Sequence, residues 1–251
     1  MKLKMIFLTL LTSLLLLGER VEAKTLHAIL VADSIHDITM VTKTDVKNIR
    51  EELKVITKHS KMKLKEKVFS GHDFRMDKLV KHLKKLKIKS DDIVVFYFSG
   101  HGYRHTQQTV PWPNMMFDPS RPGINLQYVA DILWSKKPQF ALVVSDCCNN
   151  YIERGFFGNA DKMIDVCLYK KPTHFPGYRQ LFANAKGCVV ICSCSAGQFS
   201  YGSCCGGLFT QCFLVSLNHE LSQSKPSWDG VFQRTSSYIN HIQKPVIKIY
   251  D

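Results

Sequence analysis

The sequence predicts an α/β fold, a three-layer sandwich in which helices cover both faces of a mostly parallel sheet of about five to six strands. Apolar runs rich in β-branched and aromatic residues alternate along the chain with segments of helical periodicity. The runs at 93–99 and 140–145 are apolar almost throughout, as is typical of strands buried on both faces of a parallel sheet. Right-handed crossovers through the intervening helices would connect such strands.

The elements follow in order. The helix at 45–57 places Val46, Ile49, Leu53 and Ile56 on one buried face, and the segment 63–69 alternates like a half-exposed strand. A Pro-rich loop occupies 109–122, and the connection at 149–187 has no clear period, so we expect it to be functional or mobile. The remaining predicted strands are 26–32, 93–99, 140–145 and 188–193, and the remaining helices are 78–89, 126–135, 208–221 and 228–242.

The amino terminus has the layout of a secretory signal peptide over residues 1–23. Lys2 and Lys4 precede an apolar run at 5–17, and small residues follow near Ala23. The run is shorter than the roughly 20 residues that span a bilayer, so we expect cleavage and export to a periplasmic or secreted location, with no stable membrane span. An uncleaved membrane anchor is the alternative. The other residues, 24–251, are expected to form one globular domain.

The chain is strongly basic, with a formal net charge of +13. Many of its lysines lie at 61–67 and 78–89. The second run is an amphipathic helix whose apolar face carries Met76, Leu79, Val80, Leu83 and Leu86, so its lysines are most simply a solvated face. A basic protein that binds anionic surfaces is an alternative function, but no nucleic-acid motif accompanies the lysines and no specific nucleic acid is expected.

All nine cysteines lie from Cys147 onward. An odd number in an exported protein allows disulfides with one thiol left free, and the pairing stays open. A metal site formed by Cys188, Cys192 and Cys194 with the pair 204–205 is an alternative, although the spacing does not match the usual zinc pairs. We expect buried structural thiols for most of these residues and no metal.

Two predicted strands are followed, at their carboxyl ends, by residues that can take part in catalysis. His101 follows the strand at 93–99, and Cys148 follows the strand at 140–145. Ligands and catalytic groups collect at the carboxyl ends of strands in open α/β sheets. Neighbouring strands would therefore bring a thiol nucleophile and an imidazole within reach of each other.

The same residues match a family. Ser99-Gly100-His101-Gly102 followed by Asp146-Cys147-Cys148 resembles the caspase-like cysteine peptidases, and a bacterial member of the metacaspase branch more than the animal caspases. Ser193-Cys194-Ser195-Ala196-Gly197-Gln198 and Gly206-Gly207-Leu208-Phe209-Thr210 look like the family's substrate-cleft strand end and following helix. The resemblance covers roughly 25–222. It implies a large part at about 24–148, a loop at about 149–187 and a small part at about 188–251.

The resemblance implies a cysteine endopeptidase acting on proteins or peptides. Cys148 would attack the peptide carbonyl, and His101 would protonate the leaving amine and later activate water. The backbone amides of Gly102 and Cys148 would bind the oxyanion. The chain departs from the metacaspases at Asn149-Asn150-Tyr151, where they commonly have His-Ser-Gly. A catalytically inactive caspase-like binding or scaffold protein is the alternative.

The resemblance also implies a preference for Arg or Lys before the scissile bond. Asp45 and Asp146 match the acidic residues of the metacaspase pocket, Ser99 matches a third contact, and Ser193 and Ser195 belong to the cleft. Paired carboxylates favour a basic side chain through charge-assisted hydrogen bonds. Asp45 has an alternative role as a first-turn helix residue that follows Thr44 as the cap.

Many metacaspases require calcium, which needs several convergent oxygen ligands. This chain offers only isolated acids, so calcium dependence is not supported, and neither a cofactor nor an oligomeric state is predicted; the acids are Asp118, Asp131, Glu153, Asp161 and Asp165. Some relatives are processed in the connecting loop. The basic residues there are candidate cut points, with an uncleaved surface loop as the alternative; they are Lys170, Lys171, Arg179 and Lys186.

Overall fold

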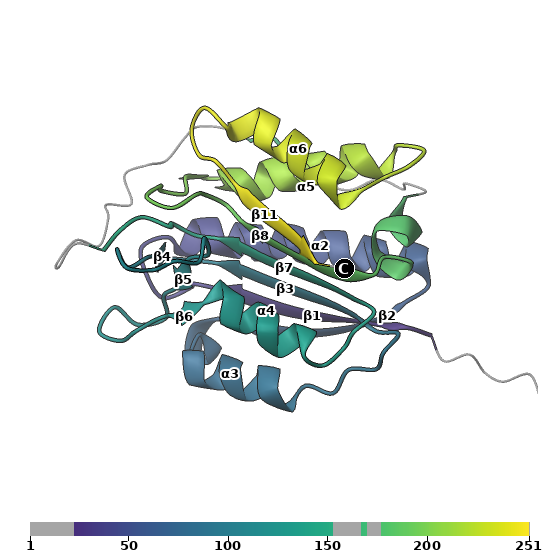
Figure 1. Ribbon diagram of the computed structural model, residues 1–251, viewed down its shortest axis with the longest axis horizontal. Helices are drawn as coiled ribbons and strands as arrows, with labels where there is room; N and C mark the ends of the chain where they lie inside the picture. The colour runs from purple at the N-terminus through teal and green to yellow at the C-terminus, as the bar shows by residue number, and fades with distance from the viewer. Residues whose placement is uncertain (1–22, 153–166, 170–176, 251) are drawn as a thin grey trace, which may run out of the picture.

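The computed structural model describes residues 23–152, 167–169 and 177–250. A six-stranded sheet in the order β11–β8–β7–β3–β1–β2 forms its middle layer (Figure 1). Neighbouring strands are parallel except β11, which pairs antiparallel with β8. The strands are β1 (Thr25–Ala32), β2 (Lys63–Phe69), β3 (Ile93–Ser99), β7 (Phe140–Asp146), β8 (Gly187–Cys192) and β11 (Val246–Tyr250).

Helices cover both faces of this sheet, so the predicted three-layer α/β fold is confirmed (Figure 1). One face is covered by α2 (Thr39–Ser60), α5 (Leu208–Leu221), α6 (Trp228–Ile239) and the π-helical turn η2 (Arg179–Ala183). The other face is covered by α3 (Met76–Lys85) and α4 (Leu126–Trp134). On α3, Leu79 and Leu83 are buried while Lys81, Lys84 and Lys85 are exposed, so its lysines form a solvated face as expected.

Small elements lie outside the sheet. After β3, a three-stranded sheet is formed by β4 (Gly102–Tyr103), β5 (Asn114–Met115) and β6 (Ile124–Asn125), which gives structure to part of the predicted Pro-rich loop. A 3₁₀ turn, η1 (Gly71–Asp73), precedes α3. Between β8 and α5, the strands β9 (Gly202–Ser203) and β10 (Gly206–Gly207) form a short hairpin.

Two helix boundaries differ by four or more residues from the sequence-based expectation, and one strand of the main sheet was not predicted. Helix α2 begins at Thr39, six residues before the predicted start at 45, and its first turn is tied to the end of β1 because the Thr42 hydroxyl donates to the Asp33 carbonyl at 2.5 Å. Helix α3 ends at Lys85 because Leu86 adopts φ −59° and ψ 123°, whereas the prediction ran to 89. Strand β11 was not predicted.

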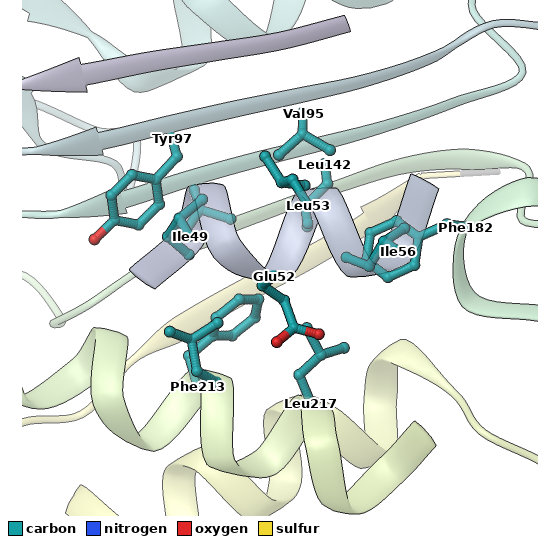
Figure 2. Close-up of a pocket in the computed structure, with 12 residues that line it drawn as sticks. Ile49, Glu52, Leu53, Ile56, Val95, Tyr97, Leu142, Phe182, Phe213 and Leu217 are labelled. Carbon is teal, nitrogen blue, oxygen red and sulfur yellow. The ribbon is translucent and has the colours of Figure 1, made fainter. Parts of the chain in front are cut away.

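A cavity lies between α2, α5 and the sheet, and Glu52 points into it among apolar side chains (Figure 2). Glu52 is only 2% exposed. The hydroxyls of Tyr178 and Tyr169 donate to its carboxylate at 3.0 and 3.3 Å. Burial is the main reason that the pKa of Glu52 rises to about 7, although the two hydrogen bonds oppose the shift.

Several expectations fall on residues outside the described ones. These are the signal peptide at 1–23 except Ala23, the acids Glu153, Asp161 and Asp165, and the cut points Lys170 and Lys171. The other two basic residues, Arg179 in η2 and Lys186 before β8, are exposed. In the described part of the chain, no helix has both the length and the apolar character needed to cross a bilayer.

Candidate active site

The chain segments that follow β3 and β7 leave the sheet side by side. Ser99 and Asp146 are paired at the carboxyl ends of the two strands, and the Gly100 N–H donates to the Asp146 carbonyl at 3.2 Å. A methyl group at Gly102 would collide with the Cys148 carbonyl oxygen and the Cys147 sulfur. Glycine therefore allows the loop after His101 to lie directly against the turn that carries Cys148.

The two adjacent cysteines differ in their surroundings. Cys147 is buried, and desolvation raises the pKa of its thiol well above the ordinary value. Cys148 is only partly buried, and its Sγ accepts a hydrogen bond from the Ser200 N–H at 3.4 Å. Of the two thiols, that of Cys148 is therefore the accessible one, and nucleophilic attack requires an accessible thiolate.

His101 has a carboxylate partner that sequence reasoning missed. Its Nε2 lies 2.7 Å from Oδ1 of Asp37, a residue in the loop between β1 and α2. The same loop carries Asp33 and His36, and the ring of His36 lies edge-on to that of His101. Because β1 pairs with β3, polar residues after β1 reach the same edge of the sheet. The polar residues Asp33, His36 and Asp37 directly follow the predicted strand at 26–32, so the sequence could have indicated that this loop contributes to the site.

Asp45 and Asp146, which we call the acid pair, lie beneath the carboxyl end of the sheet with 0% and 5% exposure. Asp45 is inside α2, where it accepts hydrogen bonds from the Ser99 hydroxyl at 2.7 Å and the Gly207 N–H at 2.7 Å. Its alternative role as a first-turn residue is wrong, because α2 begins at Thr39. Thr44 is not the cap either, since it lies within the helix and its hydroxyl donates to the Met40 carbonyl.

Asp146 is held from two sides. Its Oδ1 accepts a hydrogen bond from the Ser200 hydroxyl at 2.6 Å, and its Oδ2 accepts from the Thr210 N–H at 3.1 Å and hydroxyl at 2.6 Å. All four oxygens of the acid pair therefore accept from uncharged donors, and no ion pair between described residues includes either carboxylate. Desolvation raises the pKa of both groups, and the charge of Asp146 raises that of Asp45 further.

The hairpin β9–β10 covers the acid pair. Gly206 has φ +109°, a conformation that favours glycine, and a methyl group there would overlap Asp45 Oδ1. A methyl group at Gly207 would overlap Asp146 Oδ2. The two glycines thus bring the main chain into direct contact with both carboxylates.

The two predicted cleft serines have different partners. The Ser193 hydroxyl donates to the Cys147 carbonyl at 3.0 Å and accepts from the Cys147 N–H at 3.1 Å, so it supports the turn that carries Cys148. The Ser195 hydroxyl donates to the Lys244 carbonyl at 2.8 Å and is tied to the segment before β11. Of the five predicted substrate-binding residues, Asp45, Ser99 and Asp146 are the ones that lie together beneath the hairpin β9–β10.

Asn149, at the position where the chain departs from the metacaspase pattern, has a structural role. It is fully buried, and its side-chain amide donates to the carbonyls of Pro111 at 2.8 Å and Cys194 at 3.1 Å. Its Oδ1 accepts from Arg104 at 3.2 Å. Arg104, another residue that sequence reasoning missed, also accepts and donates main-chain hydrogen bonds with Ile152 and Asn150. Together they fix the loop that follows Cys148.

The possible metal ligands among the described residues fall into separate groups. Asp118 accepts from Ser120, and Asp131 accepts from Gln127, so these two acids have different partners. Cys188, Cys192 and Cys194 are buried as expected, and burial raises the pKa of Cys192 to about 12. The sulfurs of Cys167, Cys204 and Cys205 lie within 4.8 Å of one another, but Cys167 and Cys205 are joined in a disulfide.

Comparisons with known proteins agree with this architecture. A family model described as Caspase domain (Peptidase_C14) matches residues 20–249. Protein GSU0716 from Geobacter sulfurreducens is similar in structure, with a TM-score of 0.56 at 15% identity over 90% of this chain and 93% of that one. Caspase-1 from Spodoptera frugiperda gives a TM-score of 0.53 at 16% identity over 90% of this chain and 86% of that one.

At these identities the two solved structures show the fold alone. Comparison with curated protein sequences found no relative. The family model, however, spans most of the chain and includes the strand ends that carry His101 and Cys148. The protein therefore belongs to the caspase-domain family of cysteine peptidases.

Proposed function

We propose that the protein is a cysteine endopeptidase that cuts after Arg or Lys, with Cys148 as nucleophile and His101 as the proton-transfer group. The observation that carries the specificity is the acid pair, two buried carboxyl groups whose hydrogen-bond partners are all uncharged. Removing a carboxylate from water costs several kcal/mol unless opposite charge compensates it.

A guanidinium or ammonium group from the substrate would supply that charge. The pKa of both carboxyls is raised chiefly by burial, so the pocket binds protons readily when no other cation is present. A basic side chain that enters would replace the bound proton and form charge-assisted hydrogen bonds. Entry requires the hairpin β9–β10 to move, because Gly206 and Gly207 cover the carboxylates.

The surroundings of Cys148 support its role as nucleophile. The Ser200 N–H donates to Sγ at 3.4 Å, and Sγ lies 3.8 Å from the Ser200 carbonyl oxygen, so the main chain of Ser200 holds the sulfur in place. His101 has its Nε2 engaged by Asp37, and this leaves Nδ1 to accept the thiol proton. After the thiolate attacks the carbonyl carbon, the imidazolium gives that proton to the leaving amine, and the acyl enzyme is then hydrolysed by water that His101 activates.

The oxyanion would form between the two loops. Gly102 lies against the main chain of Cys148, and the N–H groups of these residues are the proposed donors to the developing negative charge. A side chain at 102 would separate the loops, so the close contact that glycine permits is part of the proposed catalytic arrangement.

A mechanism-based probe tests the proposal. An acyloxymethyl ketone peptide that ends in Arg should label the wild-type protein at Cys148, and the Asp-ending analogue should not. Cys148→Ala should abolish labelling. Cys188→Ala, which removes a thiol near the amino end of β8 and away from the site, is the matched control and should be labelled normally. Absence of labelling in the wild type would favour the inactive binding protein, and labelling by the Asp-ending probe alone would overturn the basic specificity.

We also propose that the protein is exported. The Cys167–Cys205 disulfide supports this, because disulfides persist mainly in oxidising compartments. The intact mass of protein isolated from its native cells gives the test. A mature chain that begins after Ala23 would agree with export, and a chain that retains residue 1 would contradict signal-peptide cleavage.

A further inference from the structure

Three sulfur atoms gather at the tip of the hairpin β9–β10. Cys205 is joined to Cys167 by the disulfide, and the exposed thiol of Cys204 lies 3.8 Å from the Cys205 sulfur. All three sulfurs lie within 4.8 Å of one another. Cys167 and Cys204 are exposed, and Cys205 is partly exposed. A free thiol thus stands beside an accessible disulfide, which is the arrangement that thiol–disulfide exchange requires.

We propose that Cys167, Cys204 and Cys205 form a thiol–disulfide exchange site that controls how tightly the hairpin covers the acid pair. In the exchange, the Cys204 thiolate attacks Cys167 Sγ, the Cys167–Cys204 bond forms, and the Cys167–Cys205 bond breaks. Cys205 leaves as a thiolate and takes up the proton that Cys204 lost. No electrons are gained or lost overall, so the step needs no external reagent.

The attack is directed to Cys167 and not to Cys205. The Cα atoms of adjacent residues are about 3.8 Å apart across a trans peptide, which is below the usual disulfide separation of about 4.4–6.8 Å. Cys167 and Cys205 have a Cα separation of 5.4 Å, within that range. A dithiol reductant opens the site fully: it reduces Cys167–Cys205 to two thiols and becomes a disulfide itself.

The disulfide holds the hairpin because its other end is anchored. The N–H of Leu168 donates to Gln211 Oε1 at 2.9 Å, and the hydroxyl of Tyr169 donates to Glu52 on α2. Gln211 is fully buried in α5, and its Nε2 donates to the Ser203 hydroxyl and the Gly206 carbonyl at 3.0 and 3.1 Å. Cys167 is therefore attached to the body of the fold independently of its bond to Cys205.

The Cys167–Cys205 disulfide is separated from the residues on the acid pair by a single peptide bond. Cys205 directly precedes Gly206, which lies on Asp45, and the next N–H, that of Gly207, donates to the same carboxylate. Holding Cys205 to the anchored Cys167 therefore restrains the residues that cover the pocket. Reducing the cross-link releases that restraint, and moving it to Cys204 places the attachment one residue further from Gly206 and so weakens it. The consequence for cleavage rests on the proposed function, but the release of the hairpin does not.

Peptide mapping after alkylation tests the exchange without any need for peptidase activity. In the full-length wild type at mildly alkaline pH and without reductant, we expect a Cys167–Cys204 peptide and an alkylated Cys205 to appear. In Cys204→Ser only the Cys167–Cys205 peptide should be found. If the wild type shows the Cys167–Cys205 peptide alone after prolonged incubation, the exchange is overturned.

Hydrogen exchange tests the coupling to the acid pair. In Cys167→Ser, or in the reduced wild type, the amides at 202–207 should exchange about tenfold faster than in the oxidised wild type, while those of β3 and β7 stay unchanged. Equal rates would overturn the coupling. If cleavage after Arg occurs, its kcat/KM should rise about tenfold in Cys167→Ser, because a larger fraction of molecules has an open pocket. If the protein shows the disulfide exchange and the faster amide exchange but no cleavage, the proposed function is contradicted and the exchange site is not.

Discussion

Ser200 joins Cys148 to the acid pair. Its N–H donates to Cys148 Sγ at 3.4 Å, and its hydroxyl donates to Asp146 Oδ1 at 2.6 Å. Gln243 holds Ser200 in place, since its side-chain amide donates to the Ser200 hydroxyl at 3.2 Å and to the Ser193 carbonyl at 2.8 Å. One residue thus contacts both the proposed nucleophile and the proposed specificity pocket, and its two groups can be tested separately.

Ser200→Ala should affect the pocket and spare the thiol. The variant keeps the N–H to Cys148 but loses the hydroxyl that orients Asp146, so kcat/KM for an Arg peptide should fall about tenfold. The rate of Cys148 alkylation by a small reagent should not change. Ser237→Ala, whose exposed hydroxyl on α6 donates to the Arg234 carbonyl, is the control and should behave like the wild type. A large loss of alkylation in Ser200→Ala would contradict this separation of roles.

The acid pair predicts that selectivity for positive charge increases with pH. Its raised pKa values mean that protons remain bound at pH values where exposed carboxyls have lost them, and a protonated pair attracts a guanidinium less. The ratio of kcat/KM for an Arg peptide to that for the neutral citrulline analogue should therefore rise with pH in the wild type. In Asp146→Asn the ratio should fall about a hundredfold at high pH. A ratio that does not depend on pH would contradict the assignment.

Asp37→Asn tests the partner of His101. Loss of the charged hydrogen bond should lower kcat about tenfold with little change in KM, because Asp37 orients the imidazole and does not touch the pocket. Asp91→Asn, an exposed acid just before β3 at the opposite end of the sheet, is the charge-matched control. A change confined to KM would argue against a positioning role for Asp37.

Glu52 predicts that stability decreases from acid to neutral pH. Folding raises its pKa from 4.5 to about 7, so the folded state binds this proton more tightly than the unfolded state. The contribution is fully present below pH 4.5 and is lost as the pH rises through 7, a difference of about 3 kcal/mol in the free energy of unfolding.

Urea unfolding at pH 5 to 8 measures this effect. Glu52→Gln keeps an acceptor for Tyr169 and Tyr178 but cannot ionise, so its free energy of unfolding should change less with pH and should exceed that of the wild type at pH 8. Glu51→Gln, on the more exposed side of α2, is the control for the loss of one charge. Equal pH dependence in Glu52→Gln and the wild type would contradict the prediction.

The sequence was sufficient to predict the parallel strands of the sheet. Strands β3 and β7 are apolar because both of their faces are buried, and this leaves a continuous pattern. Strand β11 lacks that pattern, because it lies at an edge and is half-exposed, with Lys248 and Ile249 facing solvent. The early start of α2 was missed because Ile38 precedes it without a side-chain cap.

As with the fold, only part of the candidate site could be predicted from the sequence. The match to the family pointed to Asp45, Ser99 and Asp146, which lie together in the structure. The contacts of Ser200, Asp37 and Gly207 depend on how loops fold back over the strand ends, and loop geometry has no periodic pattern in the sequence. Whether His101 and Cys148 act as a dyad stays a prediction until the labelling experiment is done.

The basic run at 61–67 also acquires a role from its place in the fold. Strand β2 forms one border of the sheet, and its outward residues Lys63, Lys65 and Lys67 are all exposed. An edge strand has unpaired backbone N–H and C=O groups that can pair with a strand of another molecule. Lysines on the edge strand oppose this association because their charges repel each other. We therefore expect that the β2 edges of two copies of this protein do not associate at low ionic strength. Salt should weaken this protection, because it screens the repulsion between the lysines.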